Sequence, residues 1–397
     1  MKKTLLKNVE IYTGEEVIDN GYLLFEDDKI LAIGFMKDLV VPENTEEINL
    51  DSSLKAAPGF IDLHIHGAGG ADTMDATIEA LSTMAGILPA EGTTSFLATT
   101  ITQETKSIED ALKNAANYRK HHNKPGEAEI LGIHLEGPFI NEKRSGAQPV
   151  EHIREPDIDL FKQWQELAEN GIKLVTLAPE KENGLEFVSY LDQSGVVASI
   201  GHSDATYDET IKAVEAGAKH VTHLFNGMRG LHHREPGIAG AALLLKELLV
   251  EIIADGIHVR PEMIQLSLQT KGIDRMILIT DSMRAKCLKN GTYDLGGQDV
   301  TVNDGKALLE NGTLAGSILK MKDSIQNIIK FTGISLLDAI QLASVNPAKQ
   351  MGVYDRKGSL APGKDADIVI LDENYEVFST FCRGKIAYKR GGENSTL

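Results

Sequence analysis

Residues 59–67, GFIDLHIHG, form an apolar run of strand length that ends in His64 and His66. Seven further runs of this kind follow, and a longer segment with helical periodicity separates each from the next. They read TTSFLATTI (93–101), EILGIHLEGP (129–138), IKLVTLAPE (172–180), VVASIGHSD (196–204), AKHVTHLFNGM (218–228), LVEIIADGIHV (249–259) and RMILITDSM (275–283). Eight strand–helix alternations predict an α/β fold, a (β/α)8 TIM-like barrel.

The segments between the runs contain helix start and stop signals. Thr206 and Glu209 have the spacing of a capping box, and that helix is expected to end at Gly217. A second helix is expected to begin at Pro261 and to end at Gly272. Proline is preferred in the first turn of a helix and glycine just after its end.

Both flanks of the barrel have the texture of short strands. Residues 1–56 contain TLLKNVEIY and a hairpin around FEDDKI, and strand patterns return after Gly358 in GSLAPGKDADIVILD and VFSTFCRGKIAYK. We expect 1–56 and 358–397 to form one small β-sandwich domain built from both termini. The barrel catalytic domain would then span 57–357.

Composition narrows the class of protein. The 397 residues include 40 Lys and Arg against 58 Asp and Glu, a net charge of −18, which argues against nucleic-acid or anionic-membrane partners. No stretch resembles a secretion signal or a membrane span, and Cys287 and Cys382 are isolated in the sequence. Reduced thiols and a cytoplasmic location are therefore expected.

Polar side chains recur at the ends of five different runs, where a barrel places its catalytic groups. Any one of these histidines could simply pack in the core, but the recurrence favours a common site. The residues are His64, His66, Glu136, His202, His223 and Asp281. Imidazoles and carboxylates without a thiolate suit a divalent ion: Zn²⁺ first, with Fe²⁺, Co²⁺ or Mn²⁺ as alternatives.

Several motifs together resemble the metal-dependent amidohydrolase superfamily. The first run GFIDLHIHG, the later segment SVNPAKQMG and the return strand GSLAPGKDADIVILD are typical of that superfamily. Within it, LEGPFINEKRSGAQ, GHSDATYDE, VTHLFNGMRGLHHREPGIAGA, ADGIHV and TLAGSILKM resemble the N-acetylglucosamine-6-phosphate deacetylases. The resemblance covers essentially the whole chain and implies hydrolysis of an acetamide on a phosphorylated amino sugar.

The resemblance also implies roles for the residues at the strand ends. Glu136, His202 and His223 would hold the main metal, and Asp281 would be the catalytic acid and base. His64 and His66 would complete a second metal site, with Glu136 as the bridge, so that one or two ions bind per subunit.

The substrate-binding residues follow from the same resemblance. Arg234 and His258 would bind the phosphate, and the neighbouring subunit can contribute to this site in the family, which implies a homodimer. The remaining positions would contact the sugar and its acetyl group: Ala147, Gln148, Asn226, Gly227, Leu314, Ala315 and Gly316. Some members have His where this chain has Gln148, and an amide can donate a hydrogen bond but cannot carry charge.

Other readings of the chain stay open. A dihydroorotase-like or hydantoinase-like enzyme would use a carboxylated lysine after the fourth strand, but Lys173 and Lys181 are poorly placed for that role. A deaminase and a non-catalytic barrel scaffold are further alternatives. His134 shares the strand face of Glu136 and is expected to support the site or pack, whereas alternation puts His220 on the face opposite His223.

Overall fold

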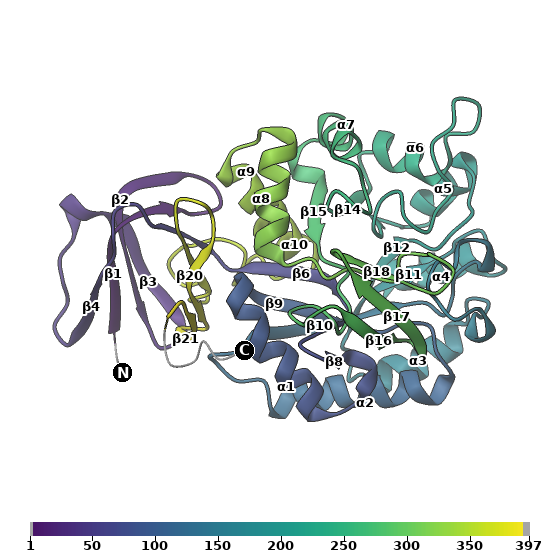
Figure 1. Ribbon diagram of the computed structural model, residues 1–397, viewed down its shortest axis with the longest axis horizontal. Helices are drawn as coiled ribbons and strands as arrows, with labels where there is room; N and C mark the ends of the chain where they lie inside the picture. Colours follow the sequence, from purple (N-terminus) through teal and green to yellow (C-terminus); the bar gives the residue numbers. More distant parts are fainter. Residues whose placement is uncertain (1–2, 392–397) are drawn as a thin grey trace.

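Eight parallel strands form a nearly closed ring in the computed structural model, which describes residues 3–391 (Figure 1). Each strand pairs with the next one in the ring. The first and last strands meet through a parallel bridge between Ile65 and Ser282, where the Asp281 amide donates to the His64 carbonyl over 2.8 Å. In ring order the strands are β6 (Phe60–Ile65), β9 (Thr93–Thr99), β10 (Glu129–Glu136), β11 (Ile172–Leu177), β12 (Val197–Ile200), β13 (His220–Val221), β14 (Leu249–Ile253) and β15 (Met276–Ile279). The predicted barrel is confirmed.

A helix follows each of these strands and covers the ring. The helices are α1 (Ile78–Ile87), α2 (Thr105–His121), α3 (Ile158–Leu167), α4 (Gly184–Gln193), α5 (Tyr207–Glu215), α6 (Gly237–Leu244), α7 (Pro261–Lys271) and α8 (Met321–Thr332). The capping box at the start of α5 is confirmed, because Thr206 and Glu209 bond each other's backbone amides over 2.8 and 3.2 Å. None of the helices among residues 3–391 is long and apolar enough to cross a membrane.

One end of the barrel is closed by apolar side chains. Ile61, Leu131 and Leu249 pack with Ala348 of α10 (Asn346–Gln350) and with Met351 directly after it. Helix α10 follows α9 (Leu336–Ile340) in the chain. This closure lies at the amino ends of the strands. The polar residues at the carboxyl ends are therefore left facing the open end, as the barrel architecture requires of an active site.

Strands from both termini form a separate sheet beside the barrel (Figure 1). Its members are β1 (Lys3–Tyr12), β2 (Val17–Glu26), β3 (Lys29–Phe35), β4 (Thr45–Asn49), β5 (Lys55–Pro58), β19 (Ile368–Leu371), β20 (Val377–Cys382) and β21 (Lys385–Lys389). The sheet folds over its own core, because Phe25 of β2 and Phe381 of β20 have three strands between them in sheet order, yet their rings are 5.4 Å apart. The exact boundaries at 56, 57, 357 and 358 stay predictions, and residues 1–2 and 392–397 of the predicted domain lie outside the described residues.

A small three-stranded sheet between β15 and α8 was not predicted. It consists of β16 (Gly291–Leu295), β17 (Gln298–Asn303) and β18 (Lys306–Leu308), and a two-stranded ribbon of β7 (Gly67–Ala68) and β8 (Ala71–Asp72) follows β6. Two hydrogen bonds attach the three-stranded sheet to loops beside the barrel mouth. Gln298 Nε2 donates to the Ala147 carbonyl over 2.6 Å, and Gln103 Nε2 donates to the Gly296 carbonyl over 2.8 Å.

Candidate metal centre and its pocket

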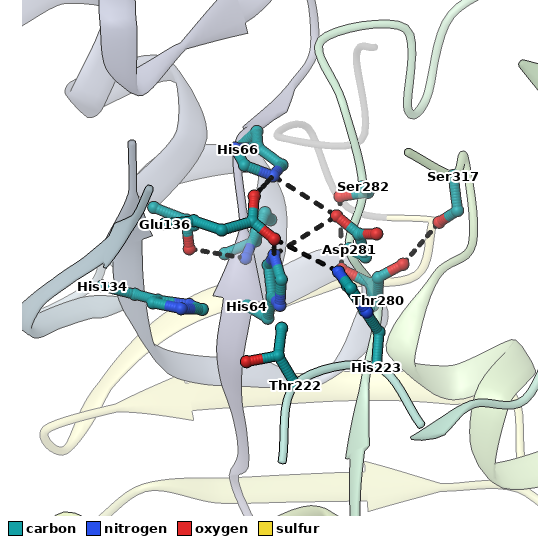
Figure 2. A network of polar contacts seen from close by, with 12 residues as sticks. His64, His66, His134, Glu136, Thr222, His223, Thr280, Asp281, Ser282 and Ser317 are labelled. Atoms are coloured by element: carbon teal, nitrogen blue, oxygen red, sulfur yellow. Dashed lines mark hydrogen bonds and ion pairs between the residues drawn. The ribbon is translucent and has the colours of Figure 1, made fainter. Parts of the chain in front are cut away.

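The six strand-end residues predicted to form a site come together at the carboxyl end of the barrel. Figure 2 shows the carboxylates of Glu136 and Asp281 on either side of His64 and His66. All six residues are buried, and Asp281 retains the largest exposed fraction. The predicted convergence is therefore present in the structure.

Glu136, His202 and His223 form the first group of possible ligands. Glu136 Oε1 lies 3.2 Å from each of the two imidazole Nε2 atoms, which are 3.1 Å from one another. The Nδ1 atom of His202 donates to the Arg144 carbonyl (2.8 Å), and that of His223 to the Asn226 carbonyl (3.1 Å). Both Nε2 atoms therefore present lone pairs to the carboxylate, and this group of three acceptors fits a cation.

His64, His66 and Asp281 form a second group beside the first. Asp281 Oδ1 lies 3.4 Å from His64 Nε2 and 3.3 Å from His66 Nε2. Glu136 joins the two groups, because its Oε1 faces His64 at 3.4 Å and its Oε2 faces His66 at 3.2 Å. His64 Nε2 is buried without a hydrogen-bond partner, as expected of an atom placed to bind an ion.

Mutual electrostatics keep the carboxylates of the centre ionised. Burial alone would raise the pKa of Asp281, but His64 and His66 hold it below its usual value. Burial likewise opposes ionisation of Glu136, yet the surrounding imidazoles keep its pKa well below the usual range. In turn, burial disfavours a charged His66, while Asp281 and Glu136 raise the pKa of His66 to about 9.

Three of the site residues adopt a left-handed backbone conformation. The φ angles are +47° at His202, +28° at His223 and +47° at Asp281, values that non-glycine residues adopt at a cost of about 1–3 kcal/mol each. Each residue lies just beyond the end of its strand, so the turn redirects its side chain over the mouth of the ring. Such strain persists where the surrounding structure fixes it, which is common at functional sites.

A pocket opens at the centre, and Glu136, His202, His223, His66 and Asp281 form part of its wall. Most of the predicted substrate residues line it, while Ala315 is buried behind it. The predicted residues in its wall are Ala147, Gln148, Asn226, Gly227, His258, Leu314 and Gly316. Ile101, Leu295 and Thr313 also line the pocket and were not predicted. Leu295 belongs to the unpredicted three-stranded sheet and Thr313 to the loop after it. Ile101 ends a predicted barrel run, but an apolar side chain there gives no sign of a binding role.

Gln148 lies between the pocket and the metal ligands. Its Nε2 donates to Glu136 Oε2 over 2.7 Å, and its Oε1 accepts from the Thr102 amide over 2.8 Å. The side chain is thus fixed at both ends. It holds the bridging carboxylate and still leaves one amide hydrogen for a ligand in the pocket.

The two residues predicted to bind phosphate lie in different places. His258 lines the pocket, and its Nδ1 lies 2.6 Å from Asp255 Oδ2. Arg234 is exposed outside the pocket, with its guanidinium 2.7 Å from His233 Nε2. Within one chain, residues 3–391 therefore do not bring Arg234 to the site.

Two further buried histidines, His134 and His220, lie near the centre but are not among its possible metal ligands Glu136, His202 and His223. His134 Nδ1 bonds the Leu63 carbonyl (3.2 Å) and its Nε2 bonds Thr176 Oγ1 (2.7 Å), so both ring nitrogens are occupied. Burial lowers the pKa of His134 to about 3, which keeps it neutral. The expectation that alternation puts His220 on the face opposite His223 does not apply, because β13 ends at Val221 and His223 lies beyond the strand. The His220 ring lies 3.2 Å from Glu251.

Neither lysine of the carboxylated-lysine alternative reaches the centre. Lys173 lies at the beginning of β11, at the opposite end of the barrel. Lys181 pairs with Glu142 (3.1 Å) and Glu155 (2.7 Å) on the surface. The bridging position belongs to Glu136.

Comparison with known proteins identifies relatives along the whole chain. A family model described as "Amidohydrolase family" matches residues 56–387. An N-acetylglucosamine-6-phosphate deacetylase of Bacillus subtilis is 49% identical over 97% of both chains. An N-acetylgalactosamine-6-phosphate deacetylase of Escherichia coli O157:H7 is 37% identical over 96% of this chain and 99% of its own. A solved mutant of the Mycobacterium smegmatis N-acetyl-D-glucosamine-6-phosphate deacetylase, in complex with N-acetyl-D-glucosamine-6-phosphate, superposes with a TM-score of 0.91 at 33% identity, covering 98% of this chain and all of the other.

Proposed function

This chain belongs to the amidohydrolase family, and we propose that it hydrolyses the acetamide of N-acetyl-D-glucosamine 6-phosphate to D-glucosamine 6-phosphate and acetate. The observation that supports hydrolysis is the convergence of two imidazole lone pairs and one carboxylate on a common point, with Asp281 beside them. The substrate is the one named for the relatives in Bacillus and Mycobacterium. The reaction would belong to amino sugar metabolism in the cytoplasm.

Glu136, His202 and His223 would hold the main divalent ion, and His64 and His66 would hold a second one with Glu136 between them. Nitrogen and carboxylate donors favour Zn²⁺, with Fe²⁺, Co²⁺ and Mn²⁺ as competitors for the same ligands. When bound, such an ion lowers the pKa of a water molecule towards about 7 and polarises the carbonyl to be attacked.

Asp281 would move the proton during the reaction. Its carboxylate accepts a proton from the attacking water as the water oxygen bonds the acetyl carbon. It then delivers that proton to the sugar nitrogen as the C–N bond breaks, so that the amine leaves neutral. The second proton of the water stays on the carboxyl group, and acetic acid ionises to acetate in solution. A carboxylate that stays ionised at neutral pH is suited to the first step, and the low pKa of Asp281 meets that requirement.

The walls of the pocket would orient the sugar over the centre. The Asn226 side chain and the Gly227 backbone would contact the sugar, while Leu314, Ala315 and Gly316 would enclose the acetyl end. Ala147 and Gln148 also line the pocket and would contact the substrate. Gln148 Nε2 donates one hydrogen to Glu136, and its second amide hydrogen would donate to the oxyanion that forms on the acetyl carbonyl.

The phosphate would be held by His258 together with Arg234 of a second subunit. Burial disfavours a charged His258, but Asp255 raises its pKa, which favours a positive ring in the pocket. Because Arg234 lies outside the pocket of its own chain, a homodimer is the arrangement that would bring an Arg234 to each site. Arginine offers the planar, bidentate geometry that phosphate prefers.

The test is acetate release from N-acetylglucosamine 6-phosphate, measured together with metal content. The enzyme should lose activity when a chelator removes the metal and regain it when Zn²⁺ is returned. N-acetylgalactosamine 6-phosphate, the substrate named for the Escherichia coli relative, serves as the second candidate and should be turned over more slowly. The proposal is refuted if the metal-loaded enzyme releases acetate from neither of the two sugars.

A further inference from the structure

Glu251 is a buried acid beneath the metal centre that the proposed reaction does not use. It projects from β14 into the barrel, where it is completely shielded from solvent. Glu251 Oε2 lies 3.1 Å from both His64 Nδ1 and the His223 amide nitrogen, and Oε1 lies 3.2 Å from His220 Nε2. An isolated carboxylate in such a place would be costly, so these three contacts are what stabilise it.

The hydrogen bonds around Glu251 have a single consistent direction. Gln350 Nε2 donates to His220 Nδ1 over 3.1 Å, which leaves the His220 proton on Nε2, facing the carboxylate. A carboxylate only accepts, so His64 must also donate to it from Nδ1. When the His64 ring carries a single proton, its position on Nδ1 leaves Nε2 with a lone pair on the side of Glu136 and Asp281.

Glu251 does not form a metal site of its own, because the neighbouring His134 has no free ring nitrogen. Ligand atoms of His64, His134 and Glu251 lie within 4.8 Å of one another. Both nitrogens of His134 are already bonded, however, to the Leu63 carbonyl and the Thr176 hydroxyl. The cluster is therefore a support beneath the metal centre.

We propose that Glu251 is a positioning residue: it fixes the tautomer and orientation of His64 for the second metal site and holds the backbone that presents His223 to the first. Carboxylates that accept from the far nitrogen of a metal-binding histidine orient the ring and increase its basicity. This inference rests on the proposed function, because it takes His64 and His223 to be metal ligands.

The test is metal binding, measured without substrate. Metal-free protein is titrated with Co²⁺, and uptake is followed by the visible absorption of the bound ion and by elemental analysis. The wild type should take up two ions per chain, and Glu251→Ala should weaken uptake of the second by about 10–100-fold. Glu251→Gln should stay within a few-fold of the wild type, because its amide oxygen can still accept from His64 if His220 and Gln350 exchange donor and acceptor roles.

Ser199→Ala is the matched control. Ser199 is buried in β12, and its hydroxyl lies 2.5 Å from Thr222 Oγ1, so this variant removes a barrel hydrogen bond that is not made to a histidine. If it weakens Co²⁺ binding as much as Glu251→Ala does, the effect is one of general stability and the inference fails. Two ions bound by Glu251→Ala as tightly as by the wild type, or only one bound by the wild type, would also overturn it.

Two measurements keep the test decisive. Should Glu251→Ala fail to fold by circular dichroism, Glu251→Asp replaces it, since the shorter acid keeps its charge but withdraws from His64 and should also weaken the second ion. Acetate release by the wild type is measured separately. An active wild type with unaltered metal binding in the Glu251 variants would refute the positioning role and leave the proposed function standing.

Discussion

Asp281 leaves β15 in a left-handed turn that aims its carboxylate at His64 and His66. Asp281→Asn keeps the shape and one possible ligand oxygen but cannot accept a proton. We expect kcat for acetate release to fall by about 10²–10⁴-fold, with metal content near that of the wild type. Enzyme assay and elemental analysis of the same preparation check both parts.

The control for this substitution is Asp304→Asn, which makes the same chemical change at an exposed position with a similar φ of +47°. It should leave kcat unaltered. Retention of most of the rate by Asp281→Asn would remove the acid–base role from this residue.

At the scale of single residues, the sequence predicted which side chains meet but not how each is held. Recurrence at strand ends was enough to bring His64, Glu136 and Asp281 together, because parallel strands share one carboxyl edge. The left-handed turns at His202 and His223 were not predictable from a pattern of apolar runs. Glu251 was also missed, since an acid in the middle of the apolar run LVEII gives no sign of the histidines that it contacts.

The three-stranded sheet β16–β18 is the element that shapes the pocket from outside the barrel. Leu295 lines the pocket, and Gln298 attaches the sheet to the loop of Ala147. Gln298→Ala removes that hydrogen bond, which is worth about 1 kcal/mol, so KM should rise several-fold while the metal content stays constant. Steady-state kinetics with N-acetylglucosamine 6-phosphate give the comparison.

Asn290→Ala is the matched variant for the far end of the same sheet, where Asn290 bonds the Asn303 side chain over 3.2 Å. It should leave KM as in the wild type. An equal change in both variants would mean that the whole sheet, rather than its attachment at Gln298, controls the pocket.

Elements with their own start and stop signals were predicted well. The helix that begins after Thr206 and the one from Pro261 to Gly272 follow their capping residues. The sheet β16–β18 was missed although its turns have a signal: Gly296–Gly297 and Asp304–Gly305 all have positive φ, the preference of tight hairpins. Helix α8, which follows the sheet, was missed because that insertion interrupts the strand–helix alternation.

At the scale of the whole molecule, a buried charge cluster joins the barrel to the terminal sheet. Glu129 begins β10 and pairs with Arg356 (2.7 Å) and Lys357 (2.8 Å), and Lys357 also pairs with Asp367, just before β19. Burial raises the pKa of Glu129, but Arg356 and Lys357 overcome this and lower it to about 2. The ionised cluster therefore stabilises the contact between the two parts of the chain.

The lowered pKa of Glu129 predicts that the protein loses stability as the pH falls. A carboxyl whose folded pKa is depressed from 4.5 to about 2 stabilises the native state above the higher value by about 3 kcal/mol, and this contribution is lost as the pH falls from about 4.5 towards 2. Glu129→Gln should lower the thermal unfolding midpoint at pH 7, and its difference from the wild type should shrink across that window. Exposed Glu43→Gln serves as the control, and a difference that stays constant with pH would contradict the prediction.

The proposed dimer makes its own prediction. Arg234→Ala should raise KM for the phosphorylated sugar far more than for the unphosphorylated one, because only the phosphate contact is lost. Arg234→Ala and Asp281→Asn chains expressed together would form mixed dimers in which one site has both an intact Asp281 and a partner's arginine. Random pairing should restore about a quarter of the wild-type activity, whereas Arg234 acting within its own chain would give no recovery.

The overall architecture was predictable because the barrel repeats one unit and each unit has an apolar signature. The pairing of both termini in one sheet agreed with the strand patterns on the two flanks. The fold-over that brings Phe25 against Phe381 was not predictable, since long-range pairing leaves no local trace in the sequence. The family resemblance, rather than a sequence pattern, placed Arg234 among the phosphate ligands, and in the structure Arg234 does not line the pocket of its own chain.

The bridge between Ile65 and Ser282 also has a meaning for biosynthesis. Because β6 is made early and its neighbour β15 late, a nascent chain holds an unpaired strand edge until most of the protein has left the ribosome. Exposed edges of this kind are where chains aggregate. Half-synthesised molecules should therefore depend on chaperones, and they have no complete ligand set with which to capture an ion before the ring closes.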